Sequence, residues 1–223
     1  MFNFLASAFD FSTIFGNLVS EWYKYLILFG VIAIVVLLLF VKKQPKRNNL
    51  SSTQRLVYTA ILSALSFIAN YFTINLGPSF QVSFTITIGF IAGYLLGGGL
   101  GFVTAFVGDF LGCILMPFGP YNPFISIGTG LFGLIPGVIF SYFKGNKYLK
   151  TVISSILVLV LCTCIINTFG LWLVYGMGKK TFWAYLYVRL PVQAVNWVVN
   201  AVLCSIIVTI LPKVLPKSKF NLE

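Results

Sequence analysis

The chain has 223 residues, of which 59% are hydrophobic and only 9% are charged. A soluble domain of this length needs more polar surface, so the composition excludes a soluble protein and predicts a polytopic, all-helical membrane protein. The net charge of +11 does not argue for nucleic-acid binding, because the basic residues lie between apolar segments, where they set membrane topology.

Apolar segments separated by short polar stretches follow one another along the chain. We expect seven membrane-spanning helices, at residues 23–41, 55–74, 82–96, 101–116, 124–143, 151–175 and 190–211. The first is followed by the basic linker KKQPKR, with no small-residue cleavage site before it, so we interpret it as a retained anchor and not as a secretory signal. The chain then divides into an appended N-terminal helix with its basic linker (1–50) and a six-helix core (51–223).

Basic residues gather in three places: after the first span, between the fifth and sixth, and after the last. With seven spans these places lie on one side of the membrane, and an excess of Lys and Arg marks that side as cytoplasmic. The N-terminus is then expected outside and the C-terminus inside. The residues are Lys42, Lys43, Lys46, Arg47, Arg55, Lys144, Lys147, Lys150, Lys213, Lys217 and Lys219.

The first core helix carries small residues on one face. Ala60 and Ala64 are four residues apart, with Ser63 and Ala69 as neighbours. Because lipid tails are as apolar as Leu, helix association in a membrane depends on close backbone packing, which small side chains allow. This pattern predicts a docking face for a partner, formed by Ala60 and Ala64.

Asp109 is the only acid inside the six core spans. A carboxylate at that depth must face protein or water and have a partner, or be protonated. The sequence leaves three roles open: contact with a ligand, a proton relay, or a structural hydrogen bond to a neighbouring turn or helix.

The loop MPFGPYNP contains three prolines, which stiffen it. A rigid loop that carries Tyr121, Asn122 and Phe124 is expected to form the lip of a binding pocket. The alternative is a plain connection between two helices.

The last outer loop holds three cations, although Lys and Arg are generally more frequent on the cytoplasmic side: Lys179, Lys180 and Arg189. Aromatic residues lie between them, namely Trp183, Tyr185 and Tyr187. This combination suits an anionic, aromatic ligand that arrives from outside. It equally suits snorkelling cations and an aromatic belt at the membrane interface, so both interpretations stay open.

The last helix carries a polar stripe. Gln193, Asn196 and Asn200 are spaced by three and four residues and therefore share one helix face. A polar stripe inside a membrane helix should face a cavity or another helix, so we expect it on the wall of the pocket, with Trp197 close by.

Catalytic motifs are missing from the sequence. It has no histidine, no paired intramembrane carboxylates and no phosphate-binding loop, and its four cysteines lie in apolar runs without metal-ligand spacing. We therefore expect no enzyme activity, no cofactor and no metal. Energy for active transport would come from another subunit or from an ion gradient.

In the order and spacing of its motifs, the chain resembles the S components of energy-coupling factor (ECF) vitamin transporters over residues 51–215. The resemblance rests on Ala60-x-x-x-Ala64, on FQVSFTITIGFIAGYLLGG followed by GFVTAFVGDFLGCILMPFGPYNPF, and on VRLPVQAVNWVVNAVL in the last helix. The run GD-x-x-G followed by P-x-GPY-x-P is most similar to the folate-type subfamily.

The resemblance implies a six-helix substrate-binding subunit in the bacterial cell membrane, to which this chain adds one N-terminal helix. Such a subunit would bind folate, or a related vitamin or precursor, and dock through Ala60 and Ala64 on a shared transmembrane subunit driven by two ATPases. Lys179, Lys180 and Arg189 would meet the carboxylates of folate. A stand-alone secondary carrier of a small anionic or aromatic metabolite is the main alternative, and a scaffold without transport function is a third.

Overall fold

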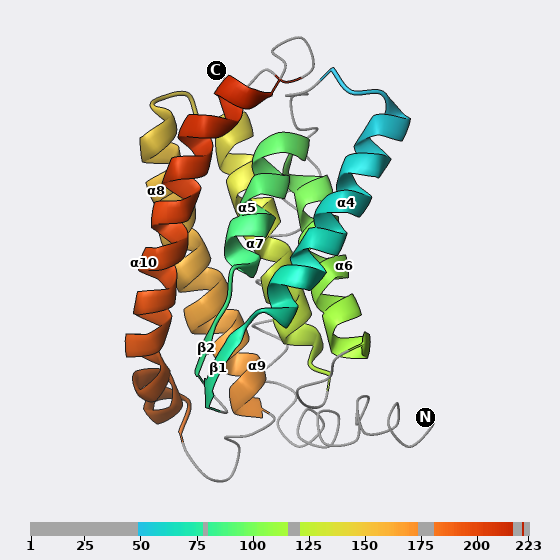
Figure 1. Cartoon of the computed structure of the whole chain (residues 1–223). Helices are drawn as coiled ribbons and strands as arrows, with labels where there is room; N and C mark the ends of the chain where they lie inside the picture. Colours follow the sequence, from blue (N-terminus) through green and yellow to red (C-terminus); the bar gives the residue numbers. More distant parts are fainter. Residues whose placement is uncertain (1–48, 78–79, 116–120, 174–180, 216–219, 221–223) are drawn as a thin grey trace.

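The computed structural model describes residues 49–77, 80–115, 121–173, 181–215 and 220. In Figure 1 these residues form helices that stand side by side, with a small two-stranded sheet towards one end. The expected span at 23–41 lies outside the described residues, as do Lys179 and Lys180.

The first described helix, α4 (Ser52–Tyr71), begins at a capping box. The Ser51 hydroxyl accepts from the Gln54 N–H at 3.3 Å, and the Gln54 side chain accepts from the Ser51 N–H at 3.1 Å. The helix turns one face inward, with Leu62, Ser63, Ser66 and Ala69 buried. A β-hairpin follows, made of β1 (Ile74–Gly77) and β2 (Phe80–Val82), in which Ile74 pairs with Val82.

The centre of the bundle consists of α5 (Thr85–Leu96), α6 (Gly98–Leu115) and α7 (Pro123–Tyr142). Glycines let these three helices approach closely, since a Cβ at Gly101 would lie 2.7 Å from the Gly93 Cα and 2.9 Å from the Gly133 carbonyl oxygen. In the most apolar 18-residue stretch of each helix, 83% of the α7 residues are buried but only 22% of the α10 residues. Helix α7 is therefore the core of the bundle and α10 lies at its periphery.

The next helix is continuous and has three parts: α8 (Lys147–Leu157), the π-helix η1 (Val158–Asn167) and α9 (Thr168–Leu171). The long helix α10 (Phe182–Val214) then returns beside it (Figure 1). Four helices in the described part of the chain are long and apolar enough to cross a membrane: Gly98–Leu115, Pro123–Tyr142, Lys147–Leu171 and Phe182–Val214.

These four helices confirm a multi-pass membrane bundle. The count of six core spans stays a prediction, because α5 is a shorter apolar helix of 12 residues and α4 is less apolar than the four spans. The two strands are an exception to the expected all-helical fold. The sequence contains a sign of them, since INL and FQV flank Gly77, Pro78 and Ser79, a turn composition between two short runs of strand-forming residues.

The start of the last helix was also placed wrongly by the sequence. The expected span began at Leu190, where the apolar segment starts, with Arg189 at the end of the preceding outer loop. In the structure α10 begins at Phe182 and continues through Pro191. A proline inside a membrane helix leaves one backbone carbonyl without its N–H donor, and groups on the same or neighbouring helices can bond to that carbonyl instead. Arg189 therefore lies within a helix and not in a loop.

The bundle has two distinct ends. The basic end is where α4 begins, α7 and α10 finish and α8 starts, and five of the six basic residues in the described part of the chain lie there: Arg55, Lys144, Lys147, Lys150 and Lys213. The hairpin end carries the β-hairpin, α9 and the start of α10 (Figure 1). Arg189 lies in the half of α10 nearer the hairpin end.

Candidate functional site

The buried face of α10 is polar over the half of the helix nearer the hairpin end. Arg189, Gln193, Asn196 and Asn200 are only 5%, 7%, 4% and 1% exposed. Their spacing of four, three and four residues places them in one row along the helix. Towards the basic end the same row continues with Cys204 and Val208, which are also buried. The polar stripe therefore faces the protein and not lipid, and it includes Arg189.

The two asparagines of the stripe hold the start of α5. Asn200 Oδ1 accepts from the Thr87 N–H at 3.2 Å and from the Thr87 hydroxyl at 2.7 Å, and its amide donates to the Ser83 carbonyl at 3.0 Å. Asn196 Oδ1 accepts from the Ser83 N–H at 3.3 Å and from the Asn200 amide at 2.9 Å. These bonds satisfy donors at a helix N-terminus, so both asparagines have a structural role.

Arg189 and Gln193 retain unused hydrogen-bonding capacity. Arg189 Nη1 donates to the Thr168 hydroxyl at 3.3 Å, but its Nε has no partner in the described part of the chain. The Gln193 side chain makes no hydrogen bond to any described residue. The only acid among the described residues is Asp109, which bonds elsewhere, so Arg189 has no carboxylate partner there. A buried guanidinium without an anion is costly, which makes this a candidate anion site.

Aromatic rings form a row that links α7, α9 and the start of α10. Phe124 meets Phe169 at 5.5 Å, Phe169 meets Trp172 at 6.1 Å, and Trp172 meets Phe182 at 6.2 Å between ring centroids. Phe169 directly follows Thr168, the hydroxyl that accepts from Arg189. The sequence predicts Phe124 as a site residue. It does not predict Phe169, Trp172 or Phe182, because no local pattern relates these rings to one another.

The start of α7 is attached to the same region by Asn122. Its amide donates to the Gly170 carbonyl at 2.7 Å, and its Oδ1 accepts from the Phe124 N–H at 3.1 Å as a helix cap. Tyr121 is buried too, with its ring edge-on to Phe110 at 5.7 Å. Burial raises the pKa of the Tyr121 hydroxyl. Asn122 thus joins the start of α7 to α9, whereas Tyr121 packs on α6.

Asp109 joins three helices. Its Oδ2 accepts from the Ser126 hydroxyl of α7 at 2.7 Å, and its Oδ1 lies 3.5 Å from the Asn70 amide of α4. The side chain is 6% exposed. Of the three roles that the sequence left open, this geometry favours the structural hydrogen bond.

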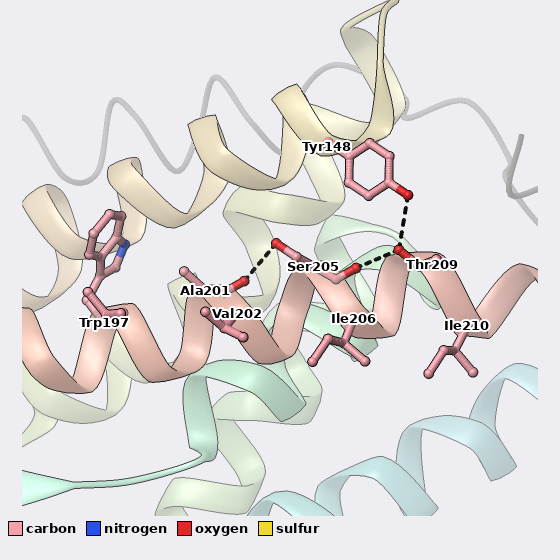
Figure 2. A pocket seen from close by; sticks show the side chains of 9 residues that line it. Tyr148, Trp197, Ala201, Val202, Ser205, Ile206, Thr209 and Ile210 are labelled. Carbon is pink, nitrogen blue, oxygen red and sulfur yellow. Dashed lines mark hydrogen bonds between the residues drawn. The ribbon is translucent and has the colours of Figure 1, made fainter.

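Trp197 lies on a different side of α10 from the anion site. Its indole N–H donates to the Ser155 carbonyl of α8 at 2.8 Å, and its ring lines an external groove between α8 and α10, shown in Figure 2. Trp183 and Tyr187 are 66% and 71% exposed, as an aromatic belt would be. The structure thus places Arg189 and Gln193 together on the buried face of α10, Phe124 in the hydrophobic core against Phe169, and Trp197 apart from both.

The small-residue face of α4 divides in two. Ala60 and Ala64 are exposed among large apolar side chains, including Leu56 and Ile61, while Ser63 is buried. On the inner side, a Cβ at Gly108 of α6 would lie 2.5 Å from the Ser66 Cβ, so α4 and α6 are closely packed. Ala60 and Ala64 therefore lie on the outer face of α4.

Fold and site together define a helical membrane protein with a buried arginine that has no carboxylate partner among the described residues. Residues 54–208 match the family model for the ECF transporter, substrate-specific component, and the chain belongs to this family. Its members are the subunits that confer substrate specificity on a transporter, so the expectation of an S component is confirmed. A search of curated proteins gave no match.

Two solved structures have a similar fold. The crystal structure of FolT bound with folic acid superposes with a TM-score of 0.59 at 23% identity, covering 68% of this chain and 91% of FolT. The S component of a bacterial ECF transporter superposes with a TM-score of 0.59 at 21% identity, covering 73% of this chain and 98% of that one. This chain therefore aligns with almost the full length of each of the two solved proteins.

Proposed function

We propose that this chain is the substrate-binding subunit of an ECF importer for folate or a closely related anionic vitamin. The observation that carries the substrate class is Arg189, a buried cation without a carboxylate partner among the described residues. A carboxylate of the ligand would supply the missing charge and accept from Nε and Nη as a charge-assisted pair. Gln193, one turn further along the same face, adds an unused amide.

The aromatic row supports a ligand with a flat ring. Phe169 directly follows Thr168, the residue that accepts from Arg189, and its ring lies between those of Phe124 and Trp172. We therefore expect a ligand that carries both a flat ring and a carboxylate. Folate has both features, and FolT, which shares this fold, was solved with folic acid bound. Lys179 and Lys180 remain candidates for a second carboxylate.

The topology follows from the charges. In our proposal the basic end faces the cytoplasm and the hairpin end faces outside, so the ligand enters beside Arg189. The chain crosses the membrane seven times, with the N-terminus outside, the C-terminus inside and a core of six spans after the helix at 23–41. The exposed Ala60–Ala64 face of α4 docks on a transmembrane subunit that two ATPases drive.

The test is a titration of the purified full chain in detergent with folate, thiamine and riboflavin, followed by tryptophan fluorescence and calorimetry. Folate is expected to bind. Replacing Arg189 by Gln should raise its dissociation constant at least about tenfold, since a hydrogen bond to a charged group contributes about 1.5–3 kcal/mol.

The charge-matched control is Lys144→Gln at the basic end, which should bind folate as the parent does. Thermal unfolding without ligand shows whether each variant is folded. No binding of folate by folded parent protein would contradict the proposed substrate, and unchanged binding by Arg189→Gln would contradict the proposed site.

A further inference from the structure

A second site lies on the outside of the bundle, between α8 and α10 near the basic end. It is an open surface groove of about 640 Å³, lined by one face of α10 and by Tyr148 of α8. Its wall on α10 carries the exposed apolar side chains of Val202, Ile206 and Ile210. Ala201 and Ser205, four residues apart, line it as well and keep it open because they are small (Figure 2).

The end of the groove nearer the basic end is polar. The hydroxyls of Tyr148 and Thr209 lie 3.3 Å apart, and the Thr209 hydroxyl donates to the Ser205 carbonyl at 2.9 Å. In Figure 2 the Tyr148 hydroxyl points towards Thr209, at the opposite end of the groove from Trp197. The groove therefore has an apolar length and a hydroxylated end, which is the polarity of an amphiphile.

Two lysines stand at that end. The Lys147 Nζ lies 5.6 Å from the centroid of the Tyr148 ring. Lys213 follows Thr209 by four residues, so it lies one turn further along the same face of α10. The only acid among the described residues is Asp109, which is buried between α4, α6 and α7. Neither lysine has a carboxylate partner in the described part of the chain.

We propose that this groove binds one anionic phospholipid, with an acyl chain along Val202, Ile206 and Ile210 and the phosphate near Lys147, Lys213 and the Tyr148 hydroxyl. Basic pockets between membrane helices on the cytoplasmic side are suited to anionic headgroups. Long lysine side chains reach the headgroup level from such positions. The site is separate from the Arg189 region and does not depend on which vitamin is transported.

The experiment is native mass spectrometry of the full chain, titrated with phosphatidylglycerol or phosphatidylcholine of the same acyl chains. Phosphatidylglycerol is expected to stay bound at a lower concentration. The double variant Lys147→Gln/Lys213→Gln should weaken its binding about tenfold or more and leave phosphatidylcholine unchanged. Arg55→Gln, which removes a cation from the start of α4 at the same end, is the charge control.

A second variant tests the apolar part. Ala201→Phe fills the groove and should weaken both lipids, whereas Val103→Phe on the exposed face of α6 should not. Equal affinity for the two headgroups, or no loss in the lysine variant, overturns the proposal. So does a photo-crosslinker at Ile206 that captures residues 23–41 of the same chain, or a second copy, in place of lipid. Thermal unfolding in detergent without added lipid shows that each variant is folded.

Discussion

The side chain of Asn200 joins three parts of the chain. It accepts from Thr87 at the start of α5, donates to the Ser83 carbonyl in the preceding segment, and donates to Asn196 on its own helix. Asn200 is 1% exposed, and its two hydrogen bonds with Thr87 are buried. A buried polar group that loses its partner cannot recover the bond from solvent or from lipid.

Replacing Asn200 by Ala is therefore expected to destabilise the protein by about 1–3 kcal/mol, because the Thr87 N–H, the Thr87 hydroxyl and the Ser83 carbonyl each lose their bond to Asn200. Thermal unfolding in detergent measures the loss. Val195→Ala, which truncates a side chain that is 60% exposed on the same helix, is the control and should change the stability much less. Equal melting temperatures for Asn200→Ala and the parent would mean that α5 does not depend on this contact.

Asp109 gives a second prediction at this scale. If its role is to join α4, α6 and α7, Asp109→Asn keeps an acceptor for Ser126 and should retain vitamin binding and transport, with a stability loss of about 1 kcal/mol. Asp109→Leu removes the acceptor from the buried Ser126 hydroxyl and should unfold at a clearly lower temperature. Uptake that disappears in a stable Asp109→Asn protein would instead support a proton relay.

Among the elements, α4 has two faces with different roles. Its inner face packs on α6 through Ser63 and Ser66, and its outer face exposes Ala60 and Ala64. We therefore expect the outer face to tolerate a large side chain and the inner face to be disrupted by one.

We expect Ala64→Trp to bind the vitamin as the parent does but to lose association with the transmembrane subunit of its transporter, as measured by co-purification. Ser63→Trp, one residue away, should instead destabilise the bundle, because that site is 6% exposed against α6. An Ala64→Trp protein that still co-purifies with its partner would refute docking through this face.

The continuous helix from α8 to α9 contains a π-helical part, Val158–Asn167. The wider turn alters which side chains face α10, and the Thr168 hydroxyl donates to the Thr163 carbonyl five residues back at 2.8 Å. Thr168 is thereby held where its oxygen accepts from Arg189. An irregular helix at this place is consistent with a functional site.

For the whole molecule, the proposed function predicts dependence on other subunits. Reconstituted alone in liposomes, the chain should bind folate but give no uptake above empty vesicles, with or without a proton or sodium gradient. Uptake should appear when the transmembrane subunit, the two ATPases and ATP are added. Gradient-driven uptake by the chain alone would favour the secondary carrier.

The amino-acid sequence by itself determined the membrane class, the polar stripe of α10, the basic end and the family. These depend on composition and on spacing along one helix, and the period of 3.6 residues makes such patterns local. It also identified Arg189 and Ala64 as candidates, although it placed Arg189 in a loop and did not separate Ala64 from Ser63 as an exposed residue.

Only the tertiary structure decided which polar residues already have partners and which remain for a ligand. Asn200 belongs to the same stripe as Gln193, yet its partner Thr87 lies 113 residues earlier in the chain. The β-hairpin, the aromatic row and the groove between α8 and α10 likewise depend on segments that meet only in the folded bundle. Hydrogen bonding and burial are properties of such long-range contacts, whereas helix periodicity is a property of the chain alone.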